Sequence, residues 1–377
     1  MEHIAYLDNS STTKPSKRAV EYITKALEAN WGNPSSLHRI GMEAEIALNE
    51  ARETVARSLN ARTDEIIFTG SGTEANNTAL LSVLKAQKRG GRIITTAIEH
   101  PSVLETAKRL TDYGFEVIAL KPDKNGIVPI SALENALTDN TLLVSMMLVN
   151  NETGAVQPVR EAAALTKRKA PNALFHCDAV QGYGKLPLNV KQLMVDLLSA
   201  SGHKIHGPKG IGFLYCKKGV HISPLITGGG QESGMRSGTE SLPLIMGLKA
   251  AVEELPNPDT QLKAQQELFD YTKDRLLSMG AVINSAEGCL PYILNVSLMG
   301  YRSETLLHFL EGRNVFVSSG SACAKGHGSY VLNEMGYDKK RTDSALRISF
   351  SRFNTKEDAD MLVSALEDAK KQLRKAN

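Results

Sequence analysis

The sequence predicts an α/β fold: a mainly parallel seven-stranded sheet with helices on both faces, plus a smaller α+β domain. Short apolar runs alternate with helix-length segments over much of the chain, which is typical of a parallel sheet covered by helices. The length of 377 residues exceeds the usual size of one hydrophobic core and favours two domains. With 42% hydrophobic and 23% charged residues, the composition is that of an ordinary globular protein.

The larger domain is expected to comprise residues 16–256. Helical patterns at 16–30 and 42–59 flank the segment WGNPSSLH, whose glycine, proline and serine residues break a helix. Seven apolar runs follow, at residues 65–69, 92–97, 115–120, 142–149, 173–177, 195–200 and 211–216. Only about ten residues separate the last two runs, too few for a parallel crossover, so the final strand is expected to run antiparallel.

The smaller α+β domain is expected to comprise residues 1–15 and 257–377. A polar segment with two prolines, ELPNPDTQ, marks the boundary near residue 256. Beyond it the pattern predicts helices at about 260–279 and 303–312, strands at 292–298, 315–318 and 345–350, and a closing helix.

Charge and the N-terminal segment argue against nucleic-acid and membrane partners. The formal net charge is +3, and the one basic run, near the C-terminus, has no interleaved aromatic residues, so we interpret it as the solvated face of a helix. The start, MEHIAYLDNSSTTKP, lacks the basic and apolar regions of a signal peptide, and no apolar stretch reaches the ~18 residues of a membrane span. We therefore expect a cytoplasmic protein.

The four cysteines show no C-x-x-C spacing, so neither a metal site nor a dithiol centre is expected. Cys177 and Cys216 lie in strand-like runs and are interpreted as structural. Cys323 instead lies in SSGSACAKGHGS, a stretch of small residues that offers little to bury a thiol.

The first candidate site is the glycine-rich turn TGSGTEANN, which opens a helix after the run EIIF. Helix N-termini bind phosphate through free N–H groups and the helix dipole. Gly70, Gly72 and Ala75 also fit the nicotinamide fingerprint, but the acidic residue expected about 20 residues later is missing. A glycine turn with no ligand remains an alternative.

The second candidate site combines HCDAVQ and SGHKIHGPKG, which follow two neighbouring apolar runs. Asp178 and Lys204 would lie at the carboxyl edge of the sheet, where such folds bind ligands. Taken alone, Asp178 is slightly more typical of a helix cap, and the neighbouring motif changes this interpretation. A strand-end lysine beside a carboxylate and an anion-binding helix terminus is the set that pyridoxal phosphate (PLP) requires. Lys209, between Pro208 and Gly210, competes less well for the lysine role.

The ordered motifs YLDNSSTT, NPSSLH, FTGSGTEANN, EHPSV, VNNETG, HCDAVQ, SGHKIHGPKG, GMRSGTES, SSGSAC and LRISFSRFNT resemble the cysteine desulfurases of the NifS/IscS type, over essentially the whole chain. The resemblance implies a fold type I PLP enzyme of the class-V aminotransferase family. It also implies a homodimer that takes sulfur from L-cysteine and passes it to an acceptor protein, such as an iron–sulfur scaffold or a tRNA-thiolation protein.

The resemblance assigns roles to individual residues. Lys204 would be the Schiff-base lysine, Asp178 would pair with the pyridine nitrogen, Gln181 would bind the ring hydroxyl and His100 would stack on the ring. The other implied contacts are to phosphate by Gly72, Thr73, Ser201, His203 and the neighbouring subunit's Thr239, to cofactor and substrate by Asn151, and to the substrate carboxylate by Arg347.

For catalysis, the resemblance implies that Lys204 takes the Cα proton, His100 carries protons and Cys323 receives the sulfur as a persulfide. The loop reads CAKGHGSY and is shorter than in many relatives, which leaves its reach and rate open. A selenocysteine lyase and an aminotransferase of the same fold are the alternatives, and a non-catalytic scaffold would not need the complete PLP set.

Overall fold

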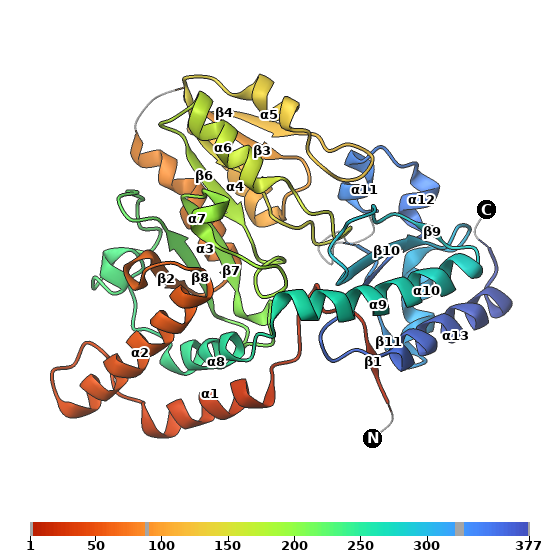
Figure 1. The fold of residues 1–377 in the computed structure, drawn as a ribbon, viewed down its shortest axis with the longest axis horizontal. Coiled ribbons are helices and arrows are strands. Elements are labelled where there is room, and N and C mark those ends of the chain that lie inside the picture. Colours follow the sequence, from red (N-terminus) through yellow and green to blue (C-terminus); the bar gives the residue numbers. More distant parts are fainter. Residues whose placement is uncertain (1–2, 87–89, 321–327, 376–377) are drawn as a thin grey trace.

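The computed structural model describes residues 3–86, 90–320 and 328–375 (Figure 1). Its largest sheet has seven strands in the order β2-β8-β7-β6-β5-β3-β4. These strands are β2 (Ile66–Thr69), β3 (Arg92–Thr96), β4 (Glu116–Leu120), β5 (Thr141–Ser145), β6 (Leu174–Asp178), β7 (Leu197–Ser201) and β8 (Gly212–Cys216). Strand β8 runs antiparallel to both β2 and β7, while the other neighbouring strands are parallel. The predicted antiparallel final strand is confirmed.

Helices cover both faces of this sheet because its strands present apolar side chains on both faces. Ile93 and Leu197 pack in one hydrophobic cluster, whereas the adjacent Ile94 and Leu198 pack in another. The first cluster includes α3 (Gly72–Leu81) and α4 (Pro101–Thr111), and the second includes α2 (Arg39–Ser58), α5 (Ile130–Ala136), α6 (Val159–Lys169), α7 (Val190–Leu193) and α8 (Leu242–Glu253). Helix α1 (Lys17–Ala29) packs on α8.

The C-terminal part forms a second layer around a three-stranded antiparallel sheet, β12-β10-β9. Its strands are β9 (Val282–Ile283), β10 (Ile293–Ser297) and β12 (Ala345–Ser349), and a parallel pair joins β1 (Ala5–Tyr6) to β11 (Val315–Phe316). The helices here are α9 (Pro258–Ser278), α10 (Ser303–Glu311), α11 (Tyr330–Glu334), α12 (Lys339–Asp343) and α13 (Lys356–Gln372). Leu7 packs in the same hydrophobic cluster as Leu294 and Leu346, so the N-terminal strand joins this layer.

One predicted strand is shorter than its apolar run. The run 142–149 forms a strand only as far as Ser145. Beyond it, the backbone N–H groups of Met146 and Leu148 still donate to β6 carbonyls, but the chain then turns at Asn150. The Asn150 carboxamide oxygen accepts from the N–H groups of Glu152 and Thr153, both at 2.9 Å. This turn places VNNETG beside the carboxyl end of the sheet.

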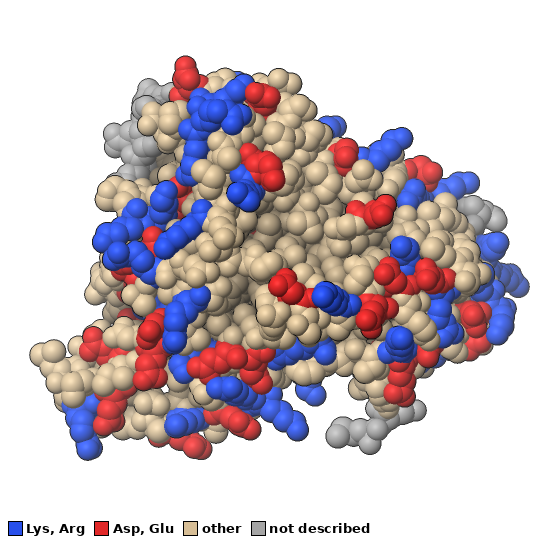
Figure 2. Space-filling model, in the orientation of Figure 1, with Lys and Arg blue, Asp and Glu red and all other residues tan. Residues whose placement is uncertain are grey.

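The surface carries no dominant sign of charge on the face in Figure 2, where basic and acidic side chains are interspersed. Within the described ranges, no helix combines the length and the apolar character needed to cross a membrane. Nor do His, Cys, Asp and Glu side chains gather in a group that could hold a metal ion in this part of the chain.

Candidate active site

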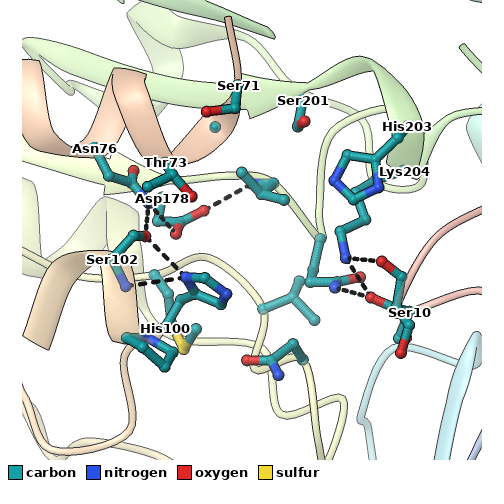
Figure 3. Close-up of a pocket in the computed structure, with 18 of the residues that line it drawn as sticks. Ser10, Ser71, Thr73, Asn76, His100, Ser102, Asp178, Ser201, His203 and Lys204 are labelled. Atoms are coloured by element: carbon teal, nitrogen blue, oxygen red, sulfur yellow. Dashed lines mark hydrogen bonds between the residues drawn. The ribbon is translucent and has the colours of Figure 1, made fainter. Parts of the chain in front are cut away.

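A cavity of about 250 Å³ lies at the carboxyl ends of the parallel strands (Figure 3). Its walls come from the start of α3, the start of α4, the end of β6, the turn after β7, the segment Ser10–Ser11 and β12. The structure brings together these residues that the sequence indicated: Gly72, Thr73, His100, Asn151, Asp178, Gln181, Ser201, His203, Lys204 and Arg347. Thr239 is exposed and does not line the cavity, and Cys323 lies outside the described residues.

The turn before α3 is built for close approach of a ligand to the backbone. Ser71 caps the helix, and its hydroxyl accepts from the Glu74 N–H at 3.1 Å. A Cβ at Gly72 would lie 2.8 Å from a methyl carbon of Val180 and 3.3 Å from the Ser201 Cβ, so the backbone leaves no room for a side chain. The first-turn N–H groups of a helix have no intrahelical acceptor, which suits this edge of the cavity to an anion.

Asp178 is held in a network of hydrogen bonds at the end of β6. The Asn76 carboxamide donates to one carboxylate oxygen at 2.7 Å, and the Val180 N–H donates to the other at 2.9 Å. Asn76 also donates to the Ser102 hydroxyl at 2.9 Å. The carboxylate is 4% exposed, so its position is set by these contacts before any ligand binds.

His100 caps α4 and is linked to the same network. Its Nδ1 accepts from the Ser102 N–H at 3.1 Å and lies 2.8 Å from the Ser102 hydroxyl. Because Nδ1 is an acceptor, the neutral ring carries its proton on Nε2. Burial lowers the pKa of His100, nearby Asp178 raises it, and Lys204 lowers it. The imidazole is therefore neutral near pH 7 and can exchange a proton at Nε2.

Lys204 ends a short turn after β7 and reaches across the cavity. Its ammonium donates to the carbonyl of Ser10 and, at 2.8 Å, to the carbonyl of Ser11. Burial lowers the pKa of Lys204 to about 7, with further lowering by Lys185 and Arg347. A substantial neutral fraction of this amine is therefore available as a nucleophile at physiological pH.

The neighbours of Lys204 are also fixed by the N-terminal segment. Nδ1 of His203 lies 3.2 Å from the Thr12 hydroxyl, and burial together with Lys204 lowers the pKa of His203 to about 4. The Gln181 carboxamide donates to the Ser10 carbonyl at 2.9 Å. Gln181 and Lys204 thus both donate to the carbonyl of Ser10, although they lie far from it in the sequence.

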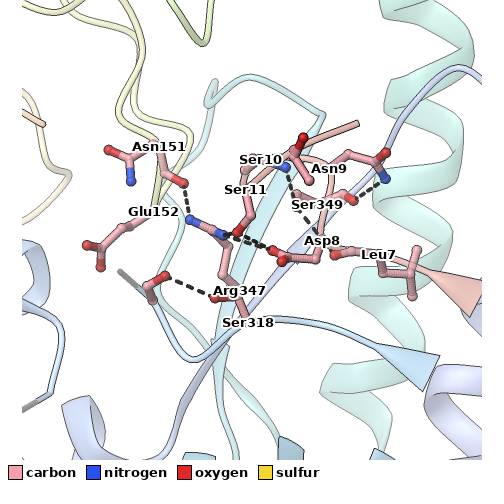
Figure 4. Close-up of polar contacts among 12 residues, drawn as sticks. Leu7, Asp8, Asn9, Ser10, Ser11, Asn151, Glu152, Ser318, Arg347 and Ser349 are labelled. Carbon is pink, nitrogen blue, oxygen red and sulfur yellow. Dashed lines mark hydrogen bonds and ion pairs between the residues drawn. The ribbon is translucent and has the colours of Figure 1, made fainter. Parts of the chain in front are cut away.

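Arg347 projects from β12 into a buried polar cluster (Figure 4). Its guanidinium donates to Asp8 at 2.8 Å, to the Ser11 hydroxyl at 2.6 Å and to the Asn151 carbonyl at 3.1 Å. The side chain is only 3% exposed. The alternation in ALRISF does turn this arginine away from the apolar cluster, but towards the cavity and Asp8 rather than towards solvent.

Four buried polar atoms of the cavity-lining residues have no hydrogen-bond partner among the described residues. They are Ser10 Oγ, Asn76 Oδ1, Asn151 Oδ1 and Arg347 Nε. Buried polar groups are nearly always paired, because an unpaired one costs about 1–3 kcal/mol. The cavity is therefore suited to a ligand that carries several polar groups of its own.

Several site residues were not identified from the sequence. Asn76 and Ser102 orient Asp178 and His100, and Ser10 and Ser11 hold Lys204. Asp8 pairs with the arginine of β12. Each of these residues lies in one of the motifs FTGSGTEANN, EHPSV and YLDNSSTT, which was the only sign of a role in the site. The spacing between the motifs does not predict which residue contacts which.

Comparison with known proteins decides the family. A family model described as aminotransferase class-V matches residues 5–362. The chain belongs to this family. Its members depend on PLP as a general property.

Similar proteins carry more specific names. The chain is 42% identical over 382 residues to the putative cysteine desulfurase IscS 1 of Bacillus subtilis, covering 99% of this chain and 100% of that one. A solved NifS-like protein superposes with a TM-score of 0.92 at 39% identity, covering 98% and 100% of the two chains. A structure described as SspA in complex with cysteine has a TM-score of 0.83 at 33% identity, with coverage of 93% and 99%.

Proposed function

We propose that the protein is a PLP-dependent cysteine desulfurase, which converts L-cysteine into L-alanine and passes the sulfur to Cys323. One observation carries this proposal: the buried amine of Lys204, whose pKa is lowered to about 7, lines the same cavity as Asp178 and the start of α3. An amine, a carboxylate and a phosphate-binding helix terminus are the three groups that PLP requires. The similarity to proteins named cysteine desulfurases selects the reaction.

The residues of the cavity fit PLP. The side chain of Asp178 would pair with the pyridine nitrogen, and that of Gln181 would bind the ring hydroxyl. His100 would stack on the ring, and Lys204 would be the covalent attachment point. The phosphate would be held by Gly72, Thr73, Ser201 and His203, and across a dimer interface by Thr239. The unpartnered polar atoms of Ser10, Asn76, Asn151 and Arg347 support a polar occupant.

The chain's own residues would then do the following work. The guanidinium of Arg347 binds the substrate carboxylate, and Asn151 contacts both cofactor and substrate. Bound PLP supplies an electron sink that weakens the bonds around Cα. The neutral amine of Lys204 takes the Cα proton, and His100 moves a proton at Nε2.

Cys323 would act as the sulfur acceptor. Its thiolate attacks the substrate sulfur, so that an S–S bond forms while the bond from sulfur to Cβ breaks. The carbon skeleton keeps the electron pair of the broken bond, takes up protons and leaves as alanine. The persulfide passes its outer sulfur to a thiol of an acceptor protein, for which iron–sulfur assembly and tRNA thiolation are the proposed pathways.

We further propose that the working enzyme is a cytoplasmic homodimer of two-domain subunits, divided into 16–256 and 1–15 with 257–377. The division is supported by a hydrophobic cluster around the three-stranded sheet that is distinct from the two around the seven-stranded sheet, while Ile293 of β10 and Ala345 of β12 pack in clusters shared with the larger part. The helices α1 and α2 and the segment 30–38 between them, red in Figure 1, expose large apolar side chains that a second subunit would cover. The most exposed are Val20, Leu27, Trp31, Leu37, Met42 and Ile46.

The test is to incubate the protein with L-cysteine and a reducing thiol and to quantify alanine and sulfide. Cys323→Ala should retain the yellow colour of bound PLP and release no alanine. The matched control is Cys216→Ala, because burial raises the pKa of Cys216 to about 12 and makes it a poor nucleophile. Alanine formation by Cys323→Ala at the wild-type rate would refute the persulfide step. Preference for L-selenocysteine by orders of magnitude would favour a selenocysteine lyase.

A further inference from the structure

Lys185 is a buried lysine behind the wall of the cavity, with no role in the function proposed above. It is 6% exposed. None of the ion pairs formed within the described part of the chain includes it. Its amine donates to the Gln181 carboxamide oxygen at 3.1 Å and lies 5.7 Å from the centre of the Tyr292 ring. Burying an amine with no carboxylate partner costs free energy. The hydrogen-bond partner and the neighbouring charges of Lys185 therefore indicate its role.

The amine of Lys185 fixes which way the Gln181 amide faces. A lysine ammonium only donates hydrogen bonds, so the carboxamide oxygen must point towards it. The NH₂ group of Gln181 then points the opposite way and donates to the Ser10 carbonyl at 2.9 Å. That carbonyl also accepts from Lys204. One hydrogen-bonded chain therefore runs from Lys185 through Gln181 and Ser10 to Lys204.

Lys185 and Lys204 also share a second, small cavity of about 30 Å³. Its other charged or titratable lining groups are His206, Tyr292 and Arg352. Burial lowers the pKa of His206 to about 4 and raises that of Tyr292 to about 12, so both are neutral near pH 7. The carboxylates of Asp8 and Asp178 and the guanidinium of Arg347 act on Lys204 from the main cavity.

The charge of Lys185 acts on the pKa of Lys204. Burial lowers the pKa of Lys185 to about 7, with a further contribution from Arg347. After burial, the charge of Lys185 is the largest influence that lowers the pKa of Lys204. A proton on Lys185 therefore disfavours a proton on Lys204 and shifts Lys204 towards its neutral form.

We propose that Lys185 is a positioning residue of the active site, which orients the Gln181 amide and favours the neutral, nucleophilic form of Lys204. The first role rests on the proposed function, because it matters only if a PLP hydroxyl meets the Gln181 NH₂ group. The second role concerns the chain alone and does not depend on that function.

The experiment compares Lys185→Met, which removes the charge and the donor, with Lys185→Gln, which removes the charge and keeps a donor. Lys209→Met is the control, because it deletes one exposed positive charge near the site. Full-length protein stripped of PLP is acylated over a range of pH, and modification of Lys204 is measured by mass spectrometry. Spectral titration of the PLP-loaded proteins gives a second pH midpoint.

Loss of the Lys185 charge should raise the pH midpoint for Lys204 acylation by about one unit in both variants. The control should keep the wild-type midpoint. PLP affinity should fall about tenfold in Lys185→Met, the equivalent of one hydrogen bond, and less in Lys185→Gln.

Midpoints equal to wild type in both variants would overturn the effect on Lys204, and PLP affinity equal to wild type in Lys185→Met would overturn the orienting role. Thermal melting monitors folding, and Lys185→Gln keeps the test valid if the methionine variant does not fold. Failure of the wild-type chain to bind PLP would refute the proposed function, whereas the acylation midpoints would still decide the effect of Lys185 on Lys204.

Discussion

The two walls of the main cavity hold their charged groups in different ways. On the wall built from α3, α4 and β6, the Asp178 carboxylate is bound by side-chain and backbone donors of the same layer. On the opposite wall, Lys204 donates to the carbonyls of Ser10 and Ser11, and Arg347 pairs with Asp8. The anion is thus fixed by permanent partners, whereas the cations rest on acceptors that a ligand can replace.

This difference fits the order in which the groups would act. In the proposed function, Asp178 would be in place before PLP binds, and preorganised electrostatic groups cost no rearrangement during the reaction. In the proposed reaction, Lys204 and Arg347 would instead change partners when a reactive carbon and a substrate carboxylate arrive. A carbonyl or a carboxylate partner keeps such cations in position and still allows the exchange.

The largest effect is expected from neutralising the fixed anion. Asp178→Asn should reduce kcat/KM for alanine formation by about 10²–10³-fold, because a preorganised charge beside the cofactor ring is lost. The new NH₂ group is itself a hydrogen-bond donor, so it cannot accept from the Asn76 carboxamide or the Val180 N–H as the carboxylate oxygens do. Steady-state kinetics and the spectrum of the PLP-bound protein measure the effect.

The control for this prediction is Asp196→Asn, which neutralises another buried carboxylate, one residue before β7. Asp196 accepts from the Phe175 N–H at 2.9 Å and pairs with Lys167 at 2.8 Å, away from the cavity. This variant should melt at a lower temperature with an unchanged kcat. Equal activity of the two variants would contradict a special role for the wall that holds Asp178.

A smaller effect, mainly on substrate binding, is expected on the wall that holds Lys204 and Arg347. We call it the exchangeable wall, because a ligand can replace the partners of its two cations. Arg347→Lys should raise KM for L-cysteine about tenfold to a hundredfold with a smaller change in kcat, because a lysine cannot bind a carboxylate in two-point geometry. Asp8→Asn should lower KM, because the anion that competes for the guanidinium is removed while Ser11 and the Asn151 carbonyl still hold it.

The result would be read from initial rates over a range of L-cysteine concentrations. An unchanged KM in Arg347→Lys would show that the substrate carboxylate binds elsewhere. A rise in KM for Asp8→Asn as large as that for Arg347→Lys would show that Asp8 positions the arginine permanently, and the wall would then not be exchangeable.

The two walls also differ in how far the sequence predicted them. Asp178 and Lys204 could be named because each follows an apolar strand, and parallel strands bring their carboxyl ends to one edge. The seven-stranded sheet and its antiparallel final strand followed from the same alternation and from one short connection. The strand expected at 142–149 was too long, because Met146 and Met147 are buried without continuing the strand.

What the sequence did not predict depends on contacts between distant segments. Asp8 lies 339 residues from its partner Arg347, and Lys204 lies 194 residues from Ser10. The first pair forms because the N-terminal segment runs beside β12, and the second because the same segment then contacts the turn after β7. No local periodicity reports them, so the acceptors of the exchangeable wall emerged only from the fold.

The smallest effect is expected from Ser102, which links Asn76 to His100 without touching either the ring of PLP or the substrate in the proposed arrangement. Ser102→Ala removes a hydroxyl that accepts from Asn76 at 2.9 Å and can donate to Nδ1 of His100 at 2.8 Å. The Ser102 N–H still reaches Nδ1 at 3.1 Å, so the ring stays in place and kcat should fall by only about three- to tenfold.

A hydrogen bond to Nδ1 as acceptor favours the neutral imidazole, so the loss of the Ser102 hydroxyl should raise the pKa of His100. If the neutral ring is the active form, the acidic limb of the pH–rate profile then moves to higher pH. Thr106→Val, one turn later on α4, is the matched control: its hydroxyl donates to the Ser102 carbonyl at 2.8 Å or to the Asn77 carboxamide oxygen at 3.0 Å, and its loss should affect stability alone. If the pH–rate profile shifts equally in both variants, His100 responds to a general loss of stability in α4. Of the charged groups on the wall built from α3, α4 and β6, only Asp178 would then be held by specific partners.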